Sequence, residues 1–533
     1  MRRRGLLAGA RMAYCARVTA AVGTQRFGAG TASGFPADFV AMPLRAMADA
    51  ALQVARDYGC EYAAFRCEQT ETEHIRLKDA LLSGRSTDLT LGISVRVLHQ
   101  GTWGFAGAGG VGIDLAARLA RAAVALARVS APLSTERVEL AAEPVHADLV
   151  WLSECRIDPF TVPDAEKVAW FAERSVRLLA VPVVDHVDAS FMAVRECLFY
   201  ADLAGTSTMQ RRIRLSPDIT VVGIGADGGF ETMRTNAPPV GRGWEYLVAA
   251  DPGWDHDGEL GEVPELLAER LQAPSMEPGR YDLVLDPTNL WLTIHESVGH
   301  ATELDRALGY EANYAGTSFA TFDKLGSLKY GSELMHVTAD RTARHGLATI
   351  AIDQEGVATQ QWDLVRDGVL VGYQTDRAMA ARQGLGRSAG CAYADSATHV
   401  PVQRMANVSL QPLDAGPSTA DLIAGVEDGL YVVGDKSWSI DMQRYNFQFT
   451  GQRFHRIRNG RLVGQVKDAA YQATTTDFWG SLAALGGPDT YLLHGATNCG
   501  KAQPGQSASV SHGCPSAVFN GVRILNTVEE AGR

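Results

Sequence analysis

The sequence lacks the features that mark several broad classes of protein. Its 533 residues contain only eight cysteines, scattered without the dense spacing of a disulfide-stabilised secreted protein. No apolar stretch approaches the roughly 20 residues needed to cross a bilayer. Arginine and lysine form no runs, and 61 acidic against 49 basic residues give a formal charge of −12, which argues against binding to nucleic acid or anionic membranes. We therefore expect a soluble protein of the reducing cytoplasm.

The beginning of the chain resembles an export signal only superficially. The segment MRRRGLLAGARMAYCARV has a basic head, but Arg11 and Arg17 interrupt every apolar run that could serve as the core of a signal peptide. We interpret residues 1–40 as a disordered extension, or as the product of a start codon assigned too far upstream.

The remaining length exceeds one ordinary core, so two domains are expected. Strand patterns follow one another, as in the antiparallel meander predicted over residues 188–228, and helical patterns stand in separate blocks. This order predicts an α+β fold and not a parallel βαβ series. We expect an N-terminal α+β domain over 41–245, a linker rich in Pro, Gly and acidic residues over 246–280, and a β-rich C-terminal domain over 281–533.

The C-terminal domain begins with a histidine motif on a predicted helix. Asp286 and Pro287 form a favourable helix start, and the helix continues through WLTIHESVGHATELDR from Trp291. Its histidines, His295 and His300, lie five residues apart, which on a regular α-helix points them about 140° away from each other. One wide π-type turn brings such residues back to nearly the same face, so we predict a local π turn beside Gly299.

The residues of this motif suit metal-assisted hydrolysis. Zinc held by three protein ligands lowers the pKa of its bound water to about 7. A carboxylate beside it, here Glu296, can take that proton and pass it to the leaving nitrogen. The alternative is that both histidines are surface or satisfied core residues, because short motifs also occur by chance in long chains.

Two histidines leave zinc short of a third ligand, and several residues could supply it. Glu303 is the local possibility, three residues after His300, although it could equally be an exposed helix charge. Cys499, in the glycine-rich loop HGATNCGKAQPGQ, is the remote one, with Lys501 available to stabilise its thiolate or a developing oxyanion, or to remain a solvated charge. Cys514, with His512 beside it, competes with Cys499 but has less favourable surroundings.

Several segments together resemble the TldD/PmbA (TldD/TldE) family of zinc metallopeptidases over residues 45–530. They are HESVGH with ATELD, the DQEG turn, PVQRMANVSLQP, the stretch from GLYVVGDKSWSIDMQRYNFQF to KDAAY, and the NCGK…PGQ…VSHG terminus. The resemblance implies that His295, His300 and Cys499 ligate Zn²⁺ and that Glu296 is the catalytic base. Glu303 and Lys501 remain possible supporting residues.

The intact motif makes the chain similar to the catalytic, TldD-type subunit of that family. The resemblance further implies a homodimer, or a heterodimer with a metal-less TldE/PmbA-type sister subunit, that encloses a chamber where unfolded or small peptides are cut with low selectivity. Backbone pairing along a sheet edge would account for the low selectivity, because main-chain hydrogen bonds do not read side chains.

Two alternatives come from other functional classes. A non-catalytic peptide-binding or scaffold subunit would hold zinc in a closed structural site with four ligands. A nicotinamide-dependent enzyme would use GAGGVG at 107–112, which satisfies the G-x-G-x-x-G pattern between a predicted strand and a helix. No acidic residue follows about 20 positions later to hold a ribose, so we interpret this segment as a strand-to-helix turn.

Overall fold

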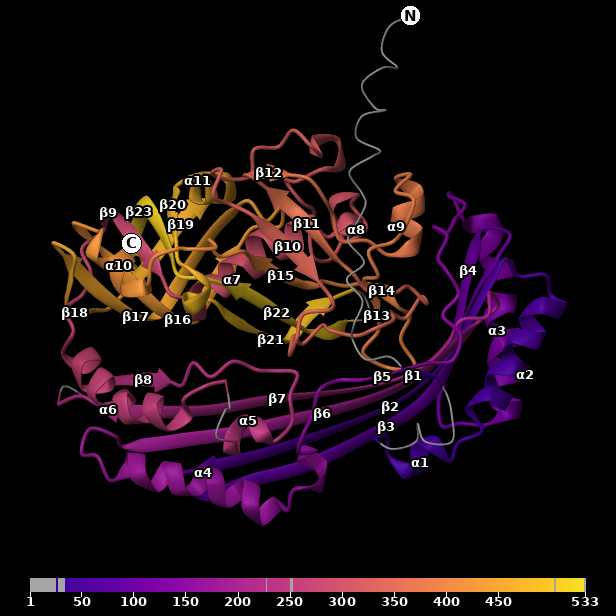
Figure 1. The fold of residues 1–533 in the computed structure, drawn as a ribbon, viewed down its shortest axis with the longest axis horizontal. Helices are drawn as coiled ribbons and strands as arrows, with labels where there is room; N and C mark the ends of the chain where they lie inside the picture. The colour runs from indigo at the N-terminus through magenta and orange to yellow at the C-terminus, as the bar shows by residue number, and fades with distance from the viewer. Residues whose placement is uncertain (1–24, 27–33, 227, 250–252, 503–504, 532–533) are drawn as a thin grey trace, which may run out of the picture.

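The computed structural model describes residues 25–26, 34–226, 228–249, 253–502 and 505–531. A long, curved sheet built by the first half of the chain runs across the molecule, and the second half lies over one face of it (Figure 1). The mixed α+β class expected from the sequence is confirmed, with an antiparallel sheet and helices first and a β-rich part afterwards. Most of the segment interpreted as an N-terminal extension, 1–24 and 27–33, lies outside the described residues.

The N-terminal sheet has the strand order β1-β5-β7-β6-β2-β3-β4, with β8 added beside β7. Its pairings are antiparallel except for β5 with β7. The strands are β1 (Gln25–Arg26), β2 (Tyr62–Lys78), β3 (Leu81–His99), β4 (Thr102–Gly109), β5 (Leu149–Leu152), β6 (His186–Asp202), β7 (Ser207–Ile224) and β8 (Phe230–Arg234). A hairpin turn between β3 and β4 lies at Gln100 and Gly101, which both adopt positive φ.

Helices cover the far face and the ends of this sheet (Figure 1). They are α1 (Ala37–Val40), α2 (Leu44–Asp57), α3 (Ile113–Ser130), α4 (Asp164–Leu179), α5 (Glu245–Val248) and α6 (His256–Gln272). The apolar faces of α2 and α3 form one core with β2 and β3. The GAGGVG segment comprises the end of β4, up to Gly109, and the turn from β4 into α3, with Gly110 and Gly112 at positive φ.

Helix α6 lies within the stretch expected to be a linker. Its apolar residues Leu260, Val263 and Leu267 are buried in the same core as Phe171 of α4 and Phe191 of β6. A segment whose apolar side chains complete a core belongs to that core, in spite of its proline and acidic content. We therefore propose that the N-terminal domain extends to the end of α6 and that only a few residues separate it from β9.

The C-terminal part is built around a small barrel. Strands β16, β9, β23, β19 and β17 pair in that order, and β17 pairs again with β16 to close the ring. The strands of this sheet are β9 (Gly279–Leu285), β16 (Asp428–Ile440), β17 (Asn446–Arg458), β18 (Arg461–Val466), β19 (Ala469–Thr474), β20 (Leu482–Leu485) and β23 (Ala517–Asn526). Closure pairs both edges of each of the five barrel strands.

Smaller elements surround the barrel and carry the site described below. The strands are β10 (Val337–Asp340), β11 (Gln361–Arg366), β12 (Val369–Leu370), β13 (Ala392–Tyr393), β14 (Val402–Gln403), β15 (Asn407–Leu410), β21 (Leu492–Lys501) and β22 (Gln506–Cys514). The helices are α7 (Pro287–Ile294), α8 (Leu304–Ala307), α9 (Arg377–Arg382), α10 (Thr419–Ala424), α11 (Thr475–Gly480) and α12 (Thr527–Ala531). Among the described residues, no helix is both long and apolar enough to cross a membrane.

A buried polar interface joins the two halves. Glu196 of β6 accepts hydrogen bonds from Arg212 Nε at 2.7 Å and from the Tyr393 hydroxyl at 2.8 Å, and it forms an ion pair with Arg214 at 2.5 Å. The turn predicted at Asp353–Gly356 is present and also crosses the interface, since Glu355 pairs with Arg96 of the long sheet at 2.8 Å. These contacts fix the C-terminal half over the sheet.

Candidate metal centre

The histidine motif occupies a widened turn that continues helix α7. The Asp286 carboxylate caps the helix by accepting from the Thr288 amide at 2.9 Å, with Pro287 in the first turn. The helix is regular up to Ile294 and becomes a π-helix over His295–Gly299. The predicted π turn is therefore confirmed, and the two imidazole rings lie with their centroids 4.7 Å apart.

Other parts of the chain satisfy the backbone of this wide turn. The Gly299 carbonyl accepts from the Gln374 side-chain amide at 2.6 Å, and the Ser297 carbonyl accepts from the Tyr330 hydroxyl at 2.5 Å. A Cβ at Gly299 would lie only 2.5 Å from Sδ of Met405. The residue before the second histidine is thus small because another side chain packs directly against its Cα.

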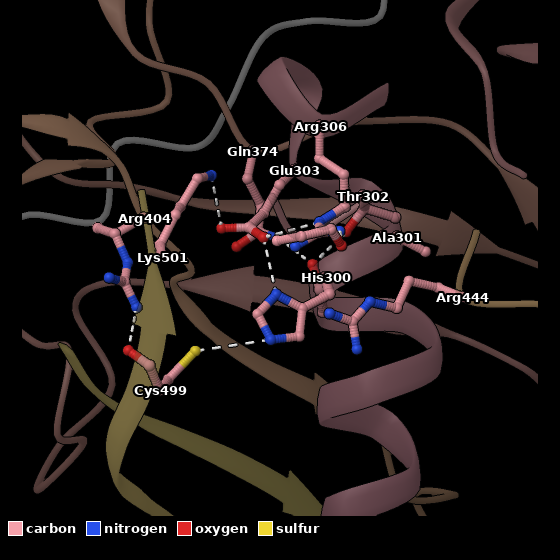
Figure 2. Close-up of polar contacts among 12 residues, drawn as sticks. His300, Ala301, Thr302, Glu303, Arg306, Gln374, Arg404, Arg444, Cys499 and Lys501 are labelled. Atoms are coloured by element: carbon pink, nitrogen blue, oxygen red, sulfur yellow. Dashed lines mark hydrogen bonds and ion pairs between the residues drawn. The ribbon is translucent and has the colours of Figure 1, made fainter. Parts of the chain in front are cut away.

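Three side chains converge where the two histidines face β21. The potential ligand atoms of His295, His300 and Cys499 lie within 4.8 Å of one another, and all three residues are buried. Sγ of Cys499 lies 3.6 Å from Nε2 of His300 (Figure 2). Within the described part of the chain, they form the one group of three or more such side chains whose ligand atoms lie this close.

His512 orients the first histidine. Its Nδ1 lies 2.9 Å from the Val408 carbonyl oxygen, which can only accept, so this nitrogen carries the proton. Burial lowers the pKa of His512 well below its usual value, with His295 adding to the effect, so the ring is neutral. Its Nε2 must then accept from Nδ1 of His295 at 2.7 Å. The Nε2 lone pair of His295 is left available for a metal.

Glu303 performs the equivalent task for the second histidine. Its Oε2 accepts from Nδ1 of His300 at 2.8 Å, on the side of the ring opposite Cys499 (Figure 2). Lys501 lies behind it, buried, with Nζ 3.1 Å from Oε1 of Glu303 and 2.8 Å from Asp305. Glu303 therefore contacts the outer nitrogen of His300, and Lys501 contacts the two carboxylates.

Cys499 lies on a strand, not in the loop expected from its glycine-rich neighbours. Strand β21 pairs with β22, and an irregularity in register between Ala496 and Cys499 interrupts the pairing beside the cysteine. Burial alone would raise the pKa of this thiol, but His300, when protonated and hydrogen-bonded to the sulfur, and the Arg404 charge outweigh it and lower the pKa. The competing Cys514 is buried elsewhere, with its Sγ 3.7 Å from the Pro287 carbonyl, and burial raises its pKa well above the usual value.

Glu296 and the three convergent residues line one cavity of about 590 Å³ between the two halves of the molecule. Arg444 also lines it and forms an ion pair with Glu296. Burial would raise the pKa of Glu296, but His295, His300 and Arg444 together lower it, so the carboxylate is ionised. The opposite wall comes from the N-terminal sheet, with Asp218 of β7 and Arg234 of β8. An ionised carboxylate thus lies beside three side chains of the kinds that ligate metals, in a hollow open to a ligand.

Comparison with known proteins agrees with this arrangement. The profile described as PmbA/TldA metallopeptidase C-terminal domain matches residues 278–526, and the profile described as PmbA/TldA metallopeptidase domain 1 matches residues 63–127. Together they cover more than half of the chain. The chain belongs to the TldD/PmbA family of metallopeptidases. The group formed by His295, His300 and Cys499 is consistent with the TldD type within this family.

Individual relatives carry corresponding names. A metalloprotease of Methanothermobacter thermautotrophicus is 28% identical over 472 residues, covering 88% of this chain and 95% of its own length. A zinc metalloprotease TldD homolog of Saccharolobus solfataricus is 24% identical and covers 49% of this chain and 55% of its own length. The crystal structure of TldE from Thermococcus kodakarensis shares the fold, with a TM-score of 0.66, 14% identity, and coverage of 89% of this chain and 98% of that one.

The donor set of this TldD/PmbA member fits zinc. Two imidazoles with free Nε2 lone pairs and a thiol of lowered pKa are the nitrogen and sulfur ligands that zinc prefers, and three protein ligands are typical of a catalytic site. The sequence alone links neither His512 to His295 nor Arg444 to Glu296. A histidine close to Cys514 in the sequence was the one available signal for His512, and Arg444 had none.

Proposed function

We propose that the protein is a zinc-dependent peptidase whose ion is held by His295, His300 and Cys499. The convergence of these three side chains with the ionised Glu296 in one cavity is the observation that carries the proposal. Zinc bound there would supply Lewis acidity and a water molecule of lowered pKa. Three protein ligands leave a position for that water, whereas the scaffold alternative requires a fourth ligand. Glu303, the nearest remaining carboxylate of the motif, contacts the outer nitrogen of His300.

The protein's own side chains have separate tasks in this proposal. Glu296 accepts a proton from the attacking water and returns it to the leaving nitrogen. His512 and the Glu303–Lys501 pair hold the two imidazoles with Nε2 turned inward, since a hydrogen bond at Nδ1 fixes both the tautomer and the ring orientation. The walls of the cavity limit access of bulk water.

An extended peptide is the substrate that the cavity suits best. Residues 494–500 of β21 line it, and among the described strands β21 pairs only with β22, which leaves its other edge without a strand. A peptide added to that edge would be held by main-chain hydrogen bonds that any sequence can make. We therefore propose unfolded or small peptides, cut with low sequence selectivity, as substrates.

The protein also has a surface suited to a second subunit. Residues 81–91 of β3 pair with β2 but extend beyond β4, so they form an open sheet edge. Leu81, Leu82 and Leu89 are more than half exposed along it, and an edge of this kind is a template for pairing with another chain. We propose a dimer, with a second copy or with a metal-less TldE-type sister subunit, enclosing the site. Light scattering of the purified protein, alone and co-expressed with such a sister, would distinguish the two.

We propose the cytoplasm as its compartment. The seven cysteines that the structure describes are all unpaired, which suits a reducing environment.

The decisive experiment combines metal analysis with turnover of an unstructured peptide. Glu296→Gln should keep one zinc per chain and lose cleavage, because only the base is removed, while Cys499→Ala should lose zinc. The matched control Cys67→Ala, in the N-terminal core, should keep both zinc and cleavage. Full turnover by the Glu296 variant, or an unchanged zinc content in the Cys499 variant, would overturn the assignment of roles.

A further inference from the structure

Arg444 lines the cavity from a turn whose backbone is strained and held by several hydrogen bonds. It is the turn residue before β17 and adopts φ of 64°, a conformation that costs free energy for a residue with a Cβ. The turn is held by the Asp441 carboxylate, which accepts from the amides of Tyr445 and Asn446 at 2.8 and 3.0 Å. The Thr475 hydroxyl donates to the Arg444 carbonyl at 2.7 Å. This construction aims one guanidinium group toward the metal centre (Figure 2).

The Arg444 guanidinium has N–H donors that are not used in hydrogen bonds. Nη1 is paired with Glu296, and Nε is buried without a partner. Within the described part of the chain, Nη2 has no hydrogen-bond partner either, and 14% of the side chain stays exposed where it lines the cavity. A half-buried guanidinium that uses only some of its N–H donors, with a carboxylate on one side and a cavity on the other, is arranged to bind a further anionic group.

Neighbouring cations are already engaged. Lys501 is held between Glu303 and Asp305, and Arg404 donates to the carbonyls of Cys499 and Gln506.

The cations farther from the base are placed differently. On the opposite wall of the cavity, Arg234 pairs with Asp435 and Asp218. Lys436 lines the cavity as well, but it lies on the exposed part of β16 and makes no contact with Glu296. Arg444 is thus the cation placed directly beside the base.

We propose that Arg444 is a second catalytic residue, which binds the carbonyl oxygen of the scissile peptide bond and stabilises the negative charge that develops there. This inference rests on the proposed peptidase function. The base and the carbonyl oxygen must lie within a few ångströms of each other, since water located at the base attacks the carbonyl carbon. A guanidinium with Nη1 on Glu296 keeps Nη2 for an acceptor that lies close to the same carboxylate.

The two residues then divide the reaction between them. As a new C–O bond forms, one water proton passes to Glu296 and the π electron pair of the C=O bond moves onto the oxygen, where Arg444 balances its charge. When this intermediate collapses, the pair returns, the C–N bond breaks, and the proton on Glu296 goes to the leaving nitrogen. A fixed donor at that oxygen contributes on the order of 10²–10³-fold to the rate.

The test compares kcat and KM of wild type, Arg444→Gln and Arg444→Lys on one unstructured peptide, with zinc content measured in each. The Gln variant should keep its zinc and KM while kcat falls on the order of 10²–10³-fold. The Lys variant retains the positive charge but lacks the planar set of N–H donors, so its kcat should lie between those of wild type and the Gln variant. Arg461→Gln, a loss of one arginine on the exposed strand β18, should behave as wild type.

A second measurement separates catalysis from mere structural support. Guanidinium ion added at millimolar concentration should partly restore kcat of Arg444→Ala, but not that of Glu296→Gln. An unchanged kcat in the Gln variant, or a rise in KM confined to peptides with a free C-terminal carboxylate and absent with amidated ones, would overturn the role at the carbonyl oxygen. If wild type itself cleaved no peptide, the proposed function would fail first, independently of Arg444.

Discussion

At the scale of single residues, the hydrogen bond from His295 to His512 decides which imidazole nitrogen faces the metal. His512→Leu removes the acceptor at Nε2 while keeping an apolar side chain in the buried space. We expect zinc affinity to fall about 10–100-fold, as is usual when the partner of a metal-binding histidine is lost. Competition with a chromophoric chelator measures this directly.

Two variants control the experiment. His512→Gln retains a side-chain acceptor and should recover part of the affinity. His455→Leu, a partly buried histidine of the barrel stacked on Tyr431, should leave zinc binding unchanged. Equal affinity of wild type and His512→Leu would mean that the tautomer of His295 is fixed by other contacts.

The proposed metal ligands, and Glu303 and Lys501 as possible supporting residues, could be found in the sequence, whereas the positions of His512 and Arg444 could not. His295, Glu296 and His300 belong to one short segment, and Cys499 stood out through the lysine and glycines around it. His512 lies 217 residues from its partner, and the register of β22 decides its position. Arg444 has no local pattern, because its function depends on a turn conformation and on which carboxylate lies opposite.

At the scale of elements, the π turn depends on how tightly β15 and its flanking residues pack against it. Gly299→Ala would place a methyl group 2.5 Å from Sδ of Met405, and overpacking of this kind costs about 1–3 kcal/mol. We expect a lower thermal midpoint and weaker zinc binding. Adding Met405→Ala makes room, so the double variant should be less destabilised than the sum of the two single changes.

The outcome can be read from a double-mutant cycle of unfolding free energies. Additive effects would show that Met405 does not limit the space at Gly299. Gly480→Ala, where a Cβ meets nothing within 4 Å, is a suitable control for the loss of backbone freedom alone.

The sequence predicted the wide turn because the spacing of two ligands on a helix leaves few geometries that bring them together. It predicted Cys499 in a loop, where the structure has a strand. Its glycines favoured the loop interpretation locally, but pairing with β22 depends on residues that follow later in the chain.

At the scale of the whole molecule, Glu196 links the long sheet to the C-terminal half. Burial would raise the pKa of this carboxyl, but Arg212, Arg214 and the Tyr393 hydroxyl lower it from 4.5 to about 2. A depressed pKa means that the ionised group stabilises the fold above pH 4.5 by on the order of 3 kcal/mol. This stabilisation is lost as the pH falls from 4.5 through 2.

Glu196→Gln should therefore lower the thermal midpoint at pH 7, and its difference from wild type should shrink as the pH falls below 4.5. Thermal unfolding of chelator-treated protein from pH 7 to pH 3 measures this without interference from metal release. A difference independent of pH would assign the effect to packing and not to charge.

The division into two halves was foreseeable from length and strand pattern, but the interface between them was not. The DQEG turn at Asp353–Gly356 is present, yet Glu355 also reaches Arg96 of the long sheet. Contacts between segments far apart in the sequence leave no periodicity in either segment.

The wide turn at His295–Gly299 has one further consequence for anyone who would transplant the motif. Its displaced carbonyls are satisfied by Gln374 and Tyr330, which belong to distant parts of the chain. HESVGH grafted onto an ordinary helix would lack these donors and would relax to regular winding, with its imidazoles splayed apart. The hexapeptide alone is therefore not sufficient to transfer this geometry, and a design would also have to include donors equivalent to Gln374 and Tyr330.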